Sequence, residues 1–306
     1  MAPRRAGGTC YERRSPQSVG HRTETMGSAK KCVAGREIRF GEKPNGISGI
    51  TGRMGKTIAN LVLQDVLVEL SCGLLRKGSE LDGQDLAEFL GFEKSGAKMF
   101  SSIDEFIKNC DAVIDFSSPL LSLEIAQKCA ESRKILVCGT TGFSDEEKQK
   151  FAANAEKTVI IWSSNMSVGV NLLMNLAEKL GNILHDDYDV EIFEMHHKNK
   201  VDSPSGTALS LGAAVAKGRG VDLKKVGNMA RVGKEAKRQK GEIGFCSLRG
   251  GDVVGDHSVI FATDGERVEL THKASNRDIF AKGAIRAAIW GSAKQPGFYS
   301  MRDVLN

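Results

Sequence analysis

Short apolar runs alternate with helical stretches along the first half of the chain, and this alternation restricts the possible folds most. Runs typical of buried strands occur at 67–73, 112–116, 135–138 and 159–162. Helical segments separate them, including 121–132 and 145–155. Strands that alternate with helices form a parallel sheet with both faces covered. The pattern therefore predicts an α/β fold with a Rossmann-like, doubly wound parallel sheet.

Three glycines mark the entry to the first helix. Gly49, Gly52 and Gly55 follow a short strand expected at 45–50, and helical apolar spacing runs over 54–67. Glycine allows the backbone to approach a pyrophosphate, which the free N–H groups at a helix start would bind. The spacing is GxxGxxG rather than the usual GxGxxG, so a plain glycine turn is the alternative interpretation.

The carboxyl ends of the expected strands are small, polar or glycine-rich. They read Phe116-Ser-Ser-Pro, Gly139-Thr-Thr-Gly and Ser163-Ser-Asn. Ligands of doubly wound sheets bind in the crevice outside these ends. The sequence therefore predicts a groove that holds a dinucleotide.

The end of the second strand indicates which dinucleotide binds. NAD-type enzymes place an acid there for the ribose hydroxyls, and NADP-type enzymes place basic groups for the 2′-phosphate. Here Leu75 is followed by Arg76 and Lys77, whereas Glu69 is expected inside the strand. The basic pair favours NADPH over NADH, although NADH stays possible; a solvated basic turn is the alternative.

Two adjacent histidines lie in a segment that combines proton-donating and cationic groups. The alternation at 189–195 predicts a strand, so His196 and His197 would point to opposite faces if the strand continued. Only one could then donate a proton to a given site. An imidazole pKa near 6.5 suits a general acid at neutral pH, and Lys200 follows four residues later.

A helix start follows the histidines. Ser203-Pro-Ser-Gly-Thr207 precedes a small-residue helix at 208–216. A serine or threonine there caps the helix, and the same geometry binds a carboxylate through free N–H groups. Both roles can hold together.

Two later segments complete the expected elements. Asp264-Gly265 predicts the turn of a hairpin at 261–268, and 280–292 predicts a last helix that packs on the first domain. One histidine among acids at 251–257 is too little for a metal site, so no metal is expected.

The basic charge of the chain comes from its first 44 residues. Residues 1–44 carry ten Lys or Arg and four Glu, whereas the remainder has 33 basic and 34 acidic side chains. We therefore expect no nucleic-acid-binding surface on the body, and no apolar run is long enough for a membrane span.

The tail and the cysteines bear on localisation. Residues 1–44 lack hydrophobic periodicity and are expected to be disordered. Seven scattered cysteines without CxxC spacing indicate free thiols in a reducing compartment, which favours the cytoplasm. A functionally silent tail is favoured, with Met26 as an alternative start, although the Arg-rich, acid-poor composition also loosely fits an organellar transit peptide.

Five motifs occur in order and carry a resemblance to a known family. They are Gly49-Ile-Thr-Gly-Arg-Met-Gly, Gly139-Thr-Thr-Gly, Asn165-Met-Ser-Val-Gly-Val-Asn, His196-His-Lys-Asn-Lys-Val-Asp-Ser-Pro-Ser-Gly-Thr and Gly255-Asp-His. Over about 46–306 the chain resembles the 4-hydroxy-tetrahydrodipicolinate (dihydrodipicolinate) reductases. The resemblance implies reduction of this small dicarboxylate by NAD(P)H in lysine biosynthesis through diaminopimelate.

The resemblance also implies residue roles. His196 would be the proton donor and Lys200 a second catalytic cation. His197, Gly206 and Thr207 would bind the substrate. Ser205, at the helix start, and Thr141, after the strand that ends at 138, are expected to bind it as well. The residues expected at the cofactor, including those at the strand ends, are Gly49, Ile50, Thr51, Gly52, Arg53, Met54, Arg76, Lys77, Phe116, Gly139, Thr140, Thr141, Ser163, Ser164, Asn165 and Met166.

The implied organisation has two domains after the tail. A dinucleotide-binding domain would comprise 45–166 and 280–306, and a smaller mixed α/β domain at 167–279 would bind substrate and form a homotetramer. Two departures stand out: many bacterial members carry an acid where this chain has Leu75, and the first strand is poor in apolar residues after Lys43-Pro44.

Two other functions stay open on the residues alone. One is a different dehydrogenase of amino or hydroxy acids, which would have no need of the His-His-Lys-Asn-Lys segment. The other is a non-catalytic nucleotide sensor, which would have no need of a proton donor.

Overall fold

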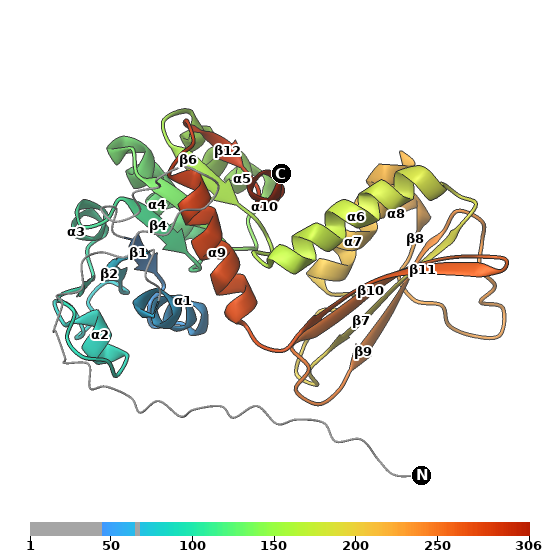
Figure 1. Ribbon diagram of the computed structural model, residues 1–306, viewed down its shortest axis with the longest axis horizontal. Helices are drawn as coiled ribbons and strands as arrows, with labels where there is room; N and C mark the ends of the chain where they lie inside the picture. Colours follow the sequence, from blue (N-terminus) through green and yellow to red (C-terminus); the bar gives the residue numbers. More distant parts are fainter. Residues whose placement is uncertain (1–44, 65–67) are drawn as a thin grey trace, which may run out of the picture. The chain divides into compact units, whose positions relative to one another are not determined.

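The structure is a computed structural model that describes residues 45–64 and 68–306. The expectations for the tail at 1–44 lie outside the described residues. Two sheets, each with its own helices, make up the described part (Figure 1). No helix in it is both long enough and apolar enough to cross a membrane.

Seven parallel strands form the first sheet, in the order β12-β6-β5-β4-β1-β2-β3. This confirms the predicted α/β class with a Rossmann-like parallel sheet. The strands are β1 Asn45–Ser48, β2 Leu70–Leu74, β3 Lys98–Phe100, β4 Ala112–Asp115, β5 Ile135–Cys138, β6 Val159–Trp162 and β12 Gly297–Tyr299.

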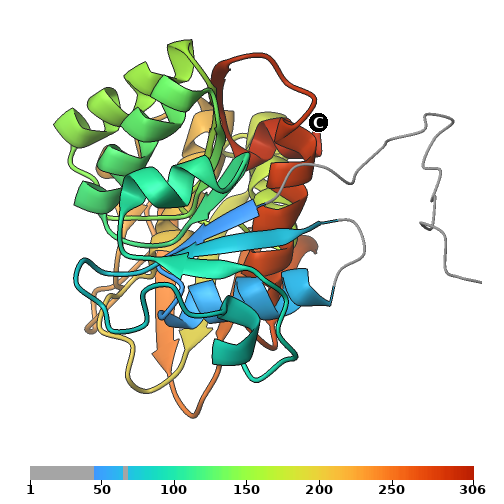
Figure 2. The same ribbon diagram turned by 90° about the vertical axis from the view of Figure 1, so that its left-hand side faces the viewer.

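Helices cover both faces of this sheet, as Figure 2 shows. Successive strand residues point to opposite faces, so Val113 and Leu136 pack in one core while Ile114 and Val137 pack in the other. The helices of this half are α1 Arg53–Leu63, α2 Leu86–Phe89, α3 Ile103–Lys108, α4 Pro119–Ser132, α5 Asp145–Ala153, the short 3-10 helix η1 Asn154–Glu156, α9 Asp278–Gly291 and α10 Met301–Leu305.

The first strand is central despite its few apolar residues, and its neighbours explain this. β1 lies between β2 and β4 and is buried along its length. A side chain at Gly46 would meet the Phe106 ring at 2.7 Å, so glycine makes room for that ring. Ser48 Oγ donates to Asp115 Oδ1 at 2.7 Å, which satisfies both buried groups. The strand is specified by long-range partners.

The boundaries around the second strand correct two expectations. Helix α1 ends at Leu63, earlier than the expected 67. Strand β2 starts at Leu70 rather than 67, so Glu69 precedes the strand and is exposed. Glu69 therefore lies at the amino end of β2, at the opposite end of the strand from Arg76 and Lys77.

Five strands form the second sheet, in the order β11-β10-β7-β9-β8. β10 is antiparallel to β7 and β11, whereas β7, β9 and β8 are parallel. Gly265, with φ +89°, forms the predicted hairpin turn. The strands are β7 Asp189–His196, β8 Gly227–Asn228, β9 Ile243–Arg249, β10 Gly255–Thr263 and β11 Glu266–Ala274.

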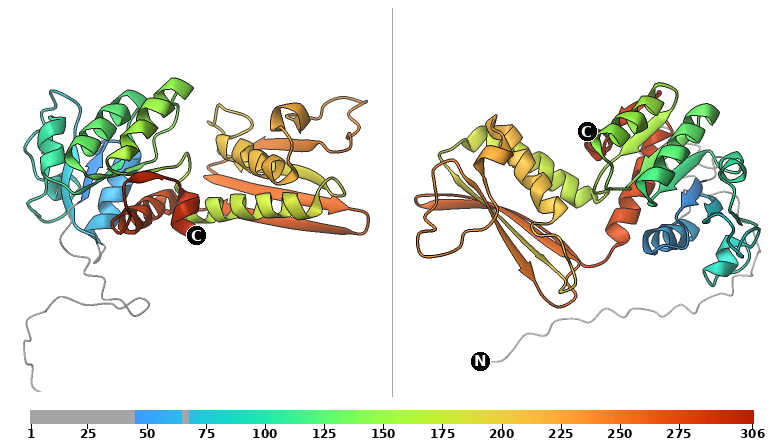
Figure 3. Two further views of the ribbon diagram at one scale, coloured as in Figure 1. Left: turned by 90° about the horizontal axis from the view of Figure 1, so that it is seen from above. Right: turned by 180° about the vertical axis from the view of Figure 1, so that it is seen from behind.

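Helices α6 Val168–Leu184, α7 Gly206–Arg219 and α8 Leu223–Val226 belong to this second half. Figures 1 and 3 show α6 and α7 along one face of the sheet, where Ile192, Phe245 and Val259 form the core. Among the described residues no helix lies along the other face. The two helices pack closely at Gly218, which has no side chain. A side chain there would stand 2.1 Å from the Glu178 carbonyl oxygen.

The last long helix returns to the first sheet, as predicted. Ala284 and Ala288 of α9 lie in the same core as Ile58 of α1. The contact is tightest at Gly283, where a side chain would lie 1.7 Å from the carbonyl oxygen of Met166. Helix α9 therefore fixes the backbone of the loop after β6, which carries several predicted cofactor residues.

Candidate functional site

The glycine loop after β1 has the shape of an anion site. Gly49 has φ +67°, and a side chain at Gly55 would lie 2.3 Å from the Gly49 carbonyl oxygen, so loop and helix need both glycines. Gly52 precedes α1 without a side-chain cap, and the first turn carries no acid. Thr51, Gly52 and Arg53 are exposed. The start of α1 can thus receive a phosphate.

A cavity of about 270 Å³ brings six predicted cofactor residues together. Phe116 lies directly over Gly139, where any side chain would stand 2.3 Å from its ring. Two residues that the sequence analysis missed, Arg277 and Phe280, complete the wall near the start of α9. The sequence predicted that this helix packs on the first domain, but no local pattern places its first turn at the cavity. The predicted lining residues are Met54, Phe116, Gly139, Ser164, Asn165 and Met166.

A buried carboxylate organises the loop after β5. Asp115 is fully buried and accepts hydrogen bonds from Ser48, Ser122 and, at 3.1 Å, Thr140 Oγ1. Thr140 Oγ1 also accepts the backbone N–H of Ser117 at 3.0 Å. The Thr140 side chain therefore serves the fold, and its predicted cofactor contact would have to use backbone. Thr141 is exposed.

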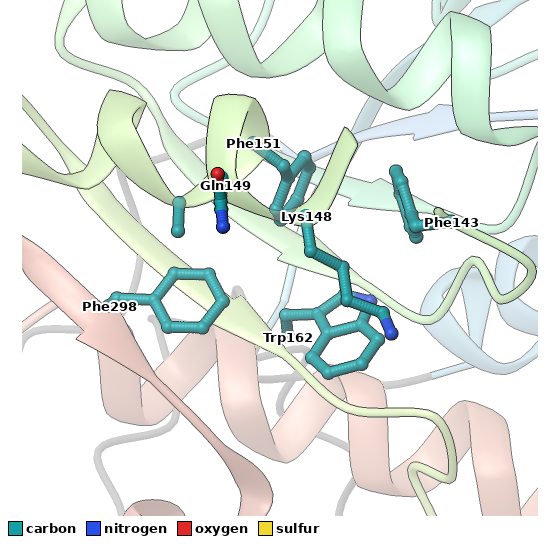
Figure 4. A pocket seen from close by; sticks show the side chains of 7 residues that line it. Phe143, Lys148, Gln149, Phe151, Trp162 and Phe298 are labelled. Carbon is teal, nitrogen blue, oxygen red and sulfur yellow. The ribbon is translucent and has the colours of Figure 1, made fainter. Parts of the chain in front are cut away.

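A second cavity, of about 230 Å³, lies elsewhere (Figure 4). Its walls are mainly the aromatic rings of Phe143, Phe151, Trp162 and Phe298. None of the predicted site residues lines it. It is distinct from the cavity at the strand ends.

The two histidines have different surroundings, because the strand does not continue through both. β7 ends at His196, which is buried on the same face as Ile192 and Glu194. That face is covered by α6 and α7. His197 follows the strand and is half-buried. His196 thus shares its face with the start of α7, whose first residues belong to the same motif.

His196 is held by a buried ion-pair network. Its Nδ1 lies 2.5 Å from Glu194 Oε2, and Arg249 Nη1 and Nη2 donate to the two Glu194 oxygens at 2.8 Å each. Burial alone would raise the pKa of Glu194, but the hydrogen bonds from Arg249 and His196 outweigh it and lower that pKa to about 2. Burial lowers the pKa of His196 below its usual value, although Glu194 opposes the shift. Glu194 is therefore a carboxylate at neutral pH.

The start of α7 joins the two halves of the site. Asn165 Nδ2 donates to Thr207 Oγ1 at 3.1 Å, which links a predicted cofactor residue to a predicted substrate residue. Gly206 has open space around it. Lys200 Nζ lies 2.9 Å from Asp202 Oδ1. Ser205 caps the helix by accepting Ala208 N–H at 3.1 Å, so its hydroxyl serves the fold.

His257 is a further residue to which the sequence analysis gave no role. It is buried beside His196, with ring centroids 5.0 Å apart, and its Nε2 lies 3.1 Å from Ser205 Oγ. Burial and the neighbouring His196 lower its pKa to about 4, so it is neutral at neutral pH. In the sequence, only its place in the Gly255-Asp-His motif set this histidine apart.

Comparison with known proteins identifies the family of the chain. Residues 45–166 match the family model described as dihydrodipicolinate reductase, N-terminus, and 169–305 match the model described as dihydrodipicolinate reductase, C-terminus. The chain belongs to the dihydrodipicolinate reductase family. This confirms the resemblance and makes the chain an NAD(P)H-dependent oxidoreductase, as predicted.

Relatives extend over most of the chain. A 4-hydroxy-tetrahydrodipicolinate reductase of Roseobacter denitrificans is 46% identical over 259 residues, which are 85% of this chain and 95% of that protein. One of Agrobacterium fabrum is 47% identical over 260 residues, with 85% and 94% covered. Among solved structures, a dipicolinate-bound dihydrodipicolinate reductase of Paenisporosarcina sp. TG-14 is 26% identical, has a TM-score of 0.68, and matches over 86% of this chain and 99% of that one.

Proposed function

We propose that the chain reduces 4-hydroxy-tetrahydrodipicolinate to tetrahydrodipicolinate with NAD(P)H, in lysine biosynthesis through diaminopimelate. The observation that carries this proposal is the hydrogen bond between Asn165 and Thr207, which puts the strand-end cavity beside the start of α7. A hydride donor in that cavity would lie near a substrate held by the helix start. The dipicolinate in the Paenisporosarcina structure is an aromatic dicarboxylate of related shape.

The residues present fit a nicotinamide dinucleotide. The uncapped start of α1 would hold its pyrophosphate, and the cavity under Phe116 and Gly139 would receive the nicotinamide end. When bound, the cofactor supplies a hydride. The chain's own contribution is to orient both reactants and to supply a proton.

Proton delivery falls to His196 in this proposal. Its Nδ1 is engaged by Glu194, so Nε2 is the atom free to act. Loss of the 4-hydroxyl as water would leave a conjugated ring. Hydride addition to that ring would leave carbanion-like charge on a carbon, and the proton on Nε2 would be transferred to that carbon, which leaves His196 neutral. Negative charge on a bound dicarboxylate favours the protonated imidazole, which offsets the effect of burial on its pKa.

The substrate carboxylates would be held by positive charge and N–H groups. The start of α7 at Gly206 and Thr207 offers backbone donors, with space around Gly206. We assign Lys200 to a catalytic cation role and His197, Ser205 and Thr141 to substrate binding. The Ser205 hydroxyl caps the helix and its backbone N–H donates to Glu194, so its part in substrate binding would be to hold the helix start in place.

A direct assay tests the reaction. We expect NADPH oxidation, measured at 340 nm, that depends on freshly generated 4-hydroxy-tetrahydrodipicolinate. Oxidation or reduction of other amino or hydroxy acids, without activity on this compound, would favour a different dehydrogenase. Cofactor binding without any turnover would favour a nucleotide sensor.

NADPH is the cofactor that we expect to bind more tightly. At the carboxyl end of β2, Leu75 is buried and cannot accept a hydrogen bond from a ribose hydroxyl. Arg76 and Lys77 follow it and are exposed, and within the described residues neither forms an ion pair. Both cations are therefore available to a 2′-phosphate.

The open face of the second sheet supports the proposed homotetramer. Phe193 and Met195 of β7 are paired with Cys246 and Leu248 of β9 on the face away from α6 and α7, and Leu248 is 43% exposed. An apolar sheet face of this kind is expected to be covered by other copies of the chain.

Replacement of Leu248 by glutamate tests that face. A charge there should destabilise an apolar interface and lower the mass measured by light scattering from four times 33.0 kDa to that of smaller species. Leu120→Glu is the matched control, because Leu120 is 76% exposed on α4. A tetramer that persists in Leu248→Glu would argue against this interface.

The cysteines bear on the compartment. Cys72, Cys110, Cys129 and Cys138 are free and buried, and Cys246 is free and exposed. Free thiols are typical of a reducing compartment, which supports the cytoplasm as the site of the reaction.

A further inference from the structure

We propose that Glu194, clamped by Arg249, is a positioning residue that fixes the tautomer of His196 and favours its protonated form. The proposal rests on the proposed function, in which His196 donates the proton. Glu194 does not line the strand-end cavity, and its carboxylate contacts His196, Arg249 and the backbone N–H of Ser205. It would therefore act by positioning the proton donor and the helix start.

Geometry determines which nitrogen of His196 is free. Glu194 is fully buried, and its Oε2 lies 2.5 Å from His196 Nδ1. An ionised carboxylate only accepts hydrogen bonds, so Nδ1 must carry a hydrogen. A side chain at Gly255 would meet His196 Nε2 at 3.0 Å, so glycine leaves this nitrogen uncovered. The proton to be transferred therefore lies on Nε2.

Arg249 holds the carboxylate in one orientation. Two parallel hydrogen bonds of 2.8 Å join the guanidinium to both Glu194 oxygens, and Arg249 Nη2 also donates to the Asp202 carbonyl oxygen at 2.6 Å. A bidentate pair of this kind fixes the plane of the carboxylate as well as its place. The imidazole ring is fixed in turn.

The same carboxylate fixes the start of α7. Ser205 N–H donates to Glu194 Oε1 at 3.2 Å. One buried group thus holds both the proton donor and the residue before Gly206. The distance between the donated proton and the carboxylate-binding helix start would be set by Glu194.

The other charges around His196 disfavour its protonated form, and Glu194 opposes them. Lys200 on the loop after β7 and Arg249 on β9 are cations that disfavour a protonated ring, and His257 on β10 is a neutral neighbour. Burial has the largest effect on the pKa of His196 and also lowers it. Among the described groups that act on the ring, Glu194 alone is an anion, so its removal should lower the pKa of His196 further.

Glu194→Gln separates charge from shape. We expect kcat to fall about tenfold, by analogy with other residues that orient a reactive histidine. The rate falls as pH rises through the pKa of His196, because only the protonated ring donates. Loss of the carboxylate lowers that pKa, so the fall should move at least about one pH unit toward acid.

Two variants accompany this experiment. Glu194→Asp keeps the charge and should hold the fall in rate near its wild-type pH. Glu191→Gln is the matched control, because Glu191 lies on the same strand, pairs with Arg231 at 2.7 Å, and faces away from His196. It should leave the pH profile unchanged.

A second measurement does not require activity. Exchange of the imidazole Cε1 hydrogen for deuterium, followed across pH by mass spectrometry of the His196 peptide in the intact enzyme, reports the pKa of that ring. We expect a lower pKa in Glu194→Gln. The same pKa in both proteins, with an unmoved pH profile, would overturn the proposal. An inactive wild-type enzyme would instead contradict the proposed function.

Discussion

Replacement of His196 by glutamine is expected to lower kcat by about 10²- to 10⁴-fold, the range for loss of a general acid. Glutamine retains a group that can hydrogen-bond to Glu194, so the network with Arg249 should persist. It has no transferable proton at neutral pH. Hydride transfer would then generate charge on the substrate that no side chain neutralises.

The measurement is steady-state turnover together with NADPH affinity and a thermal unfolding curve. NADPH affinity should match the wild type, because His196 does not line the strand-end cavity. Unfolding should match because glutamine can keep the hydrogen bond to Glu194. His185→Gln is the matched control, since His185 is exposed beyond the end of α6. A His196→Gln enzyme with full turnover would remove His196 from the proton-donor role.

Much of the fold could be predicted because the central strands are specified locally. β5 and β6 are runs of apolar residues bounded by polar or turn residues, and the structure places them at the predicted positions. β1 could not be read in this way. Its glycine and serine are explained by contacts with Phe106 and Asp115, which are 60 or more residues away in the sequence.

The candidate site was predictable where it follows from one strand or one helix start. Alternation along β7 separated His196 from His197, and the same rule would have put Glu194 beside His196, two residues earlier. The alternation rule could not identify Arg249 and His257. They reach the site through pairing of β9 and β10 with β7, and no local pattern fixes that register.

Cofactor choice tests the other half of the site. A 2′-phosphate carries charge that NADH lacks, and Arg76 and Lys77 are exposed at the strand end where that phosphate would lie. A charge-assisted hydrogen bond contributes about 1.5–3 kcal/mol when protected from water, and less when exposed. Two such bonds, weakened by exposure, amount to about 2 to 2.7 kcal/mol, or about 30- to 100-fold in affinity.

The double replacement Arg76→Ala with Lys77→Ala should therefore raise the Kd of NADPH about 30- to 100-fold and change that of NADH by less than about threefold. Titration of the intact enzyme with each nucleotide, followed by calorimetry, gives both constants. Lys224→Ala with Lys225→Ala is the matched control, since these residues form an exposed basic pair on α8. The effect should weaken at high salt, because the cations are exposed. Equal affinities for NADPH and NADH, before and after the change, would show that Arg76 and Lys77 do not select the cofactor. The role of this strand end would then be limited to Leu75, which stands where an acid would favour NADH.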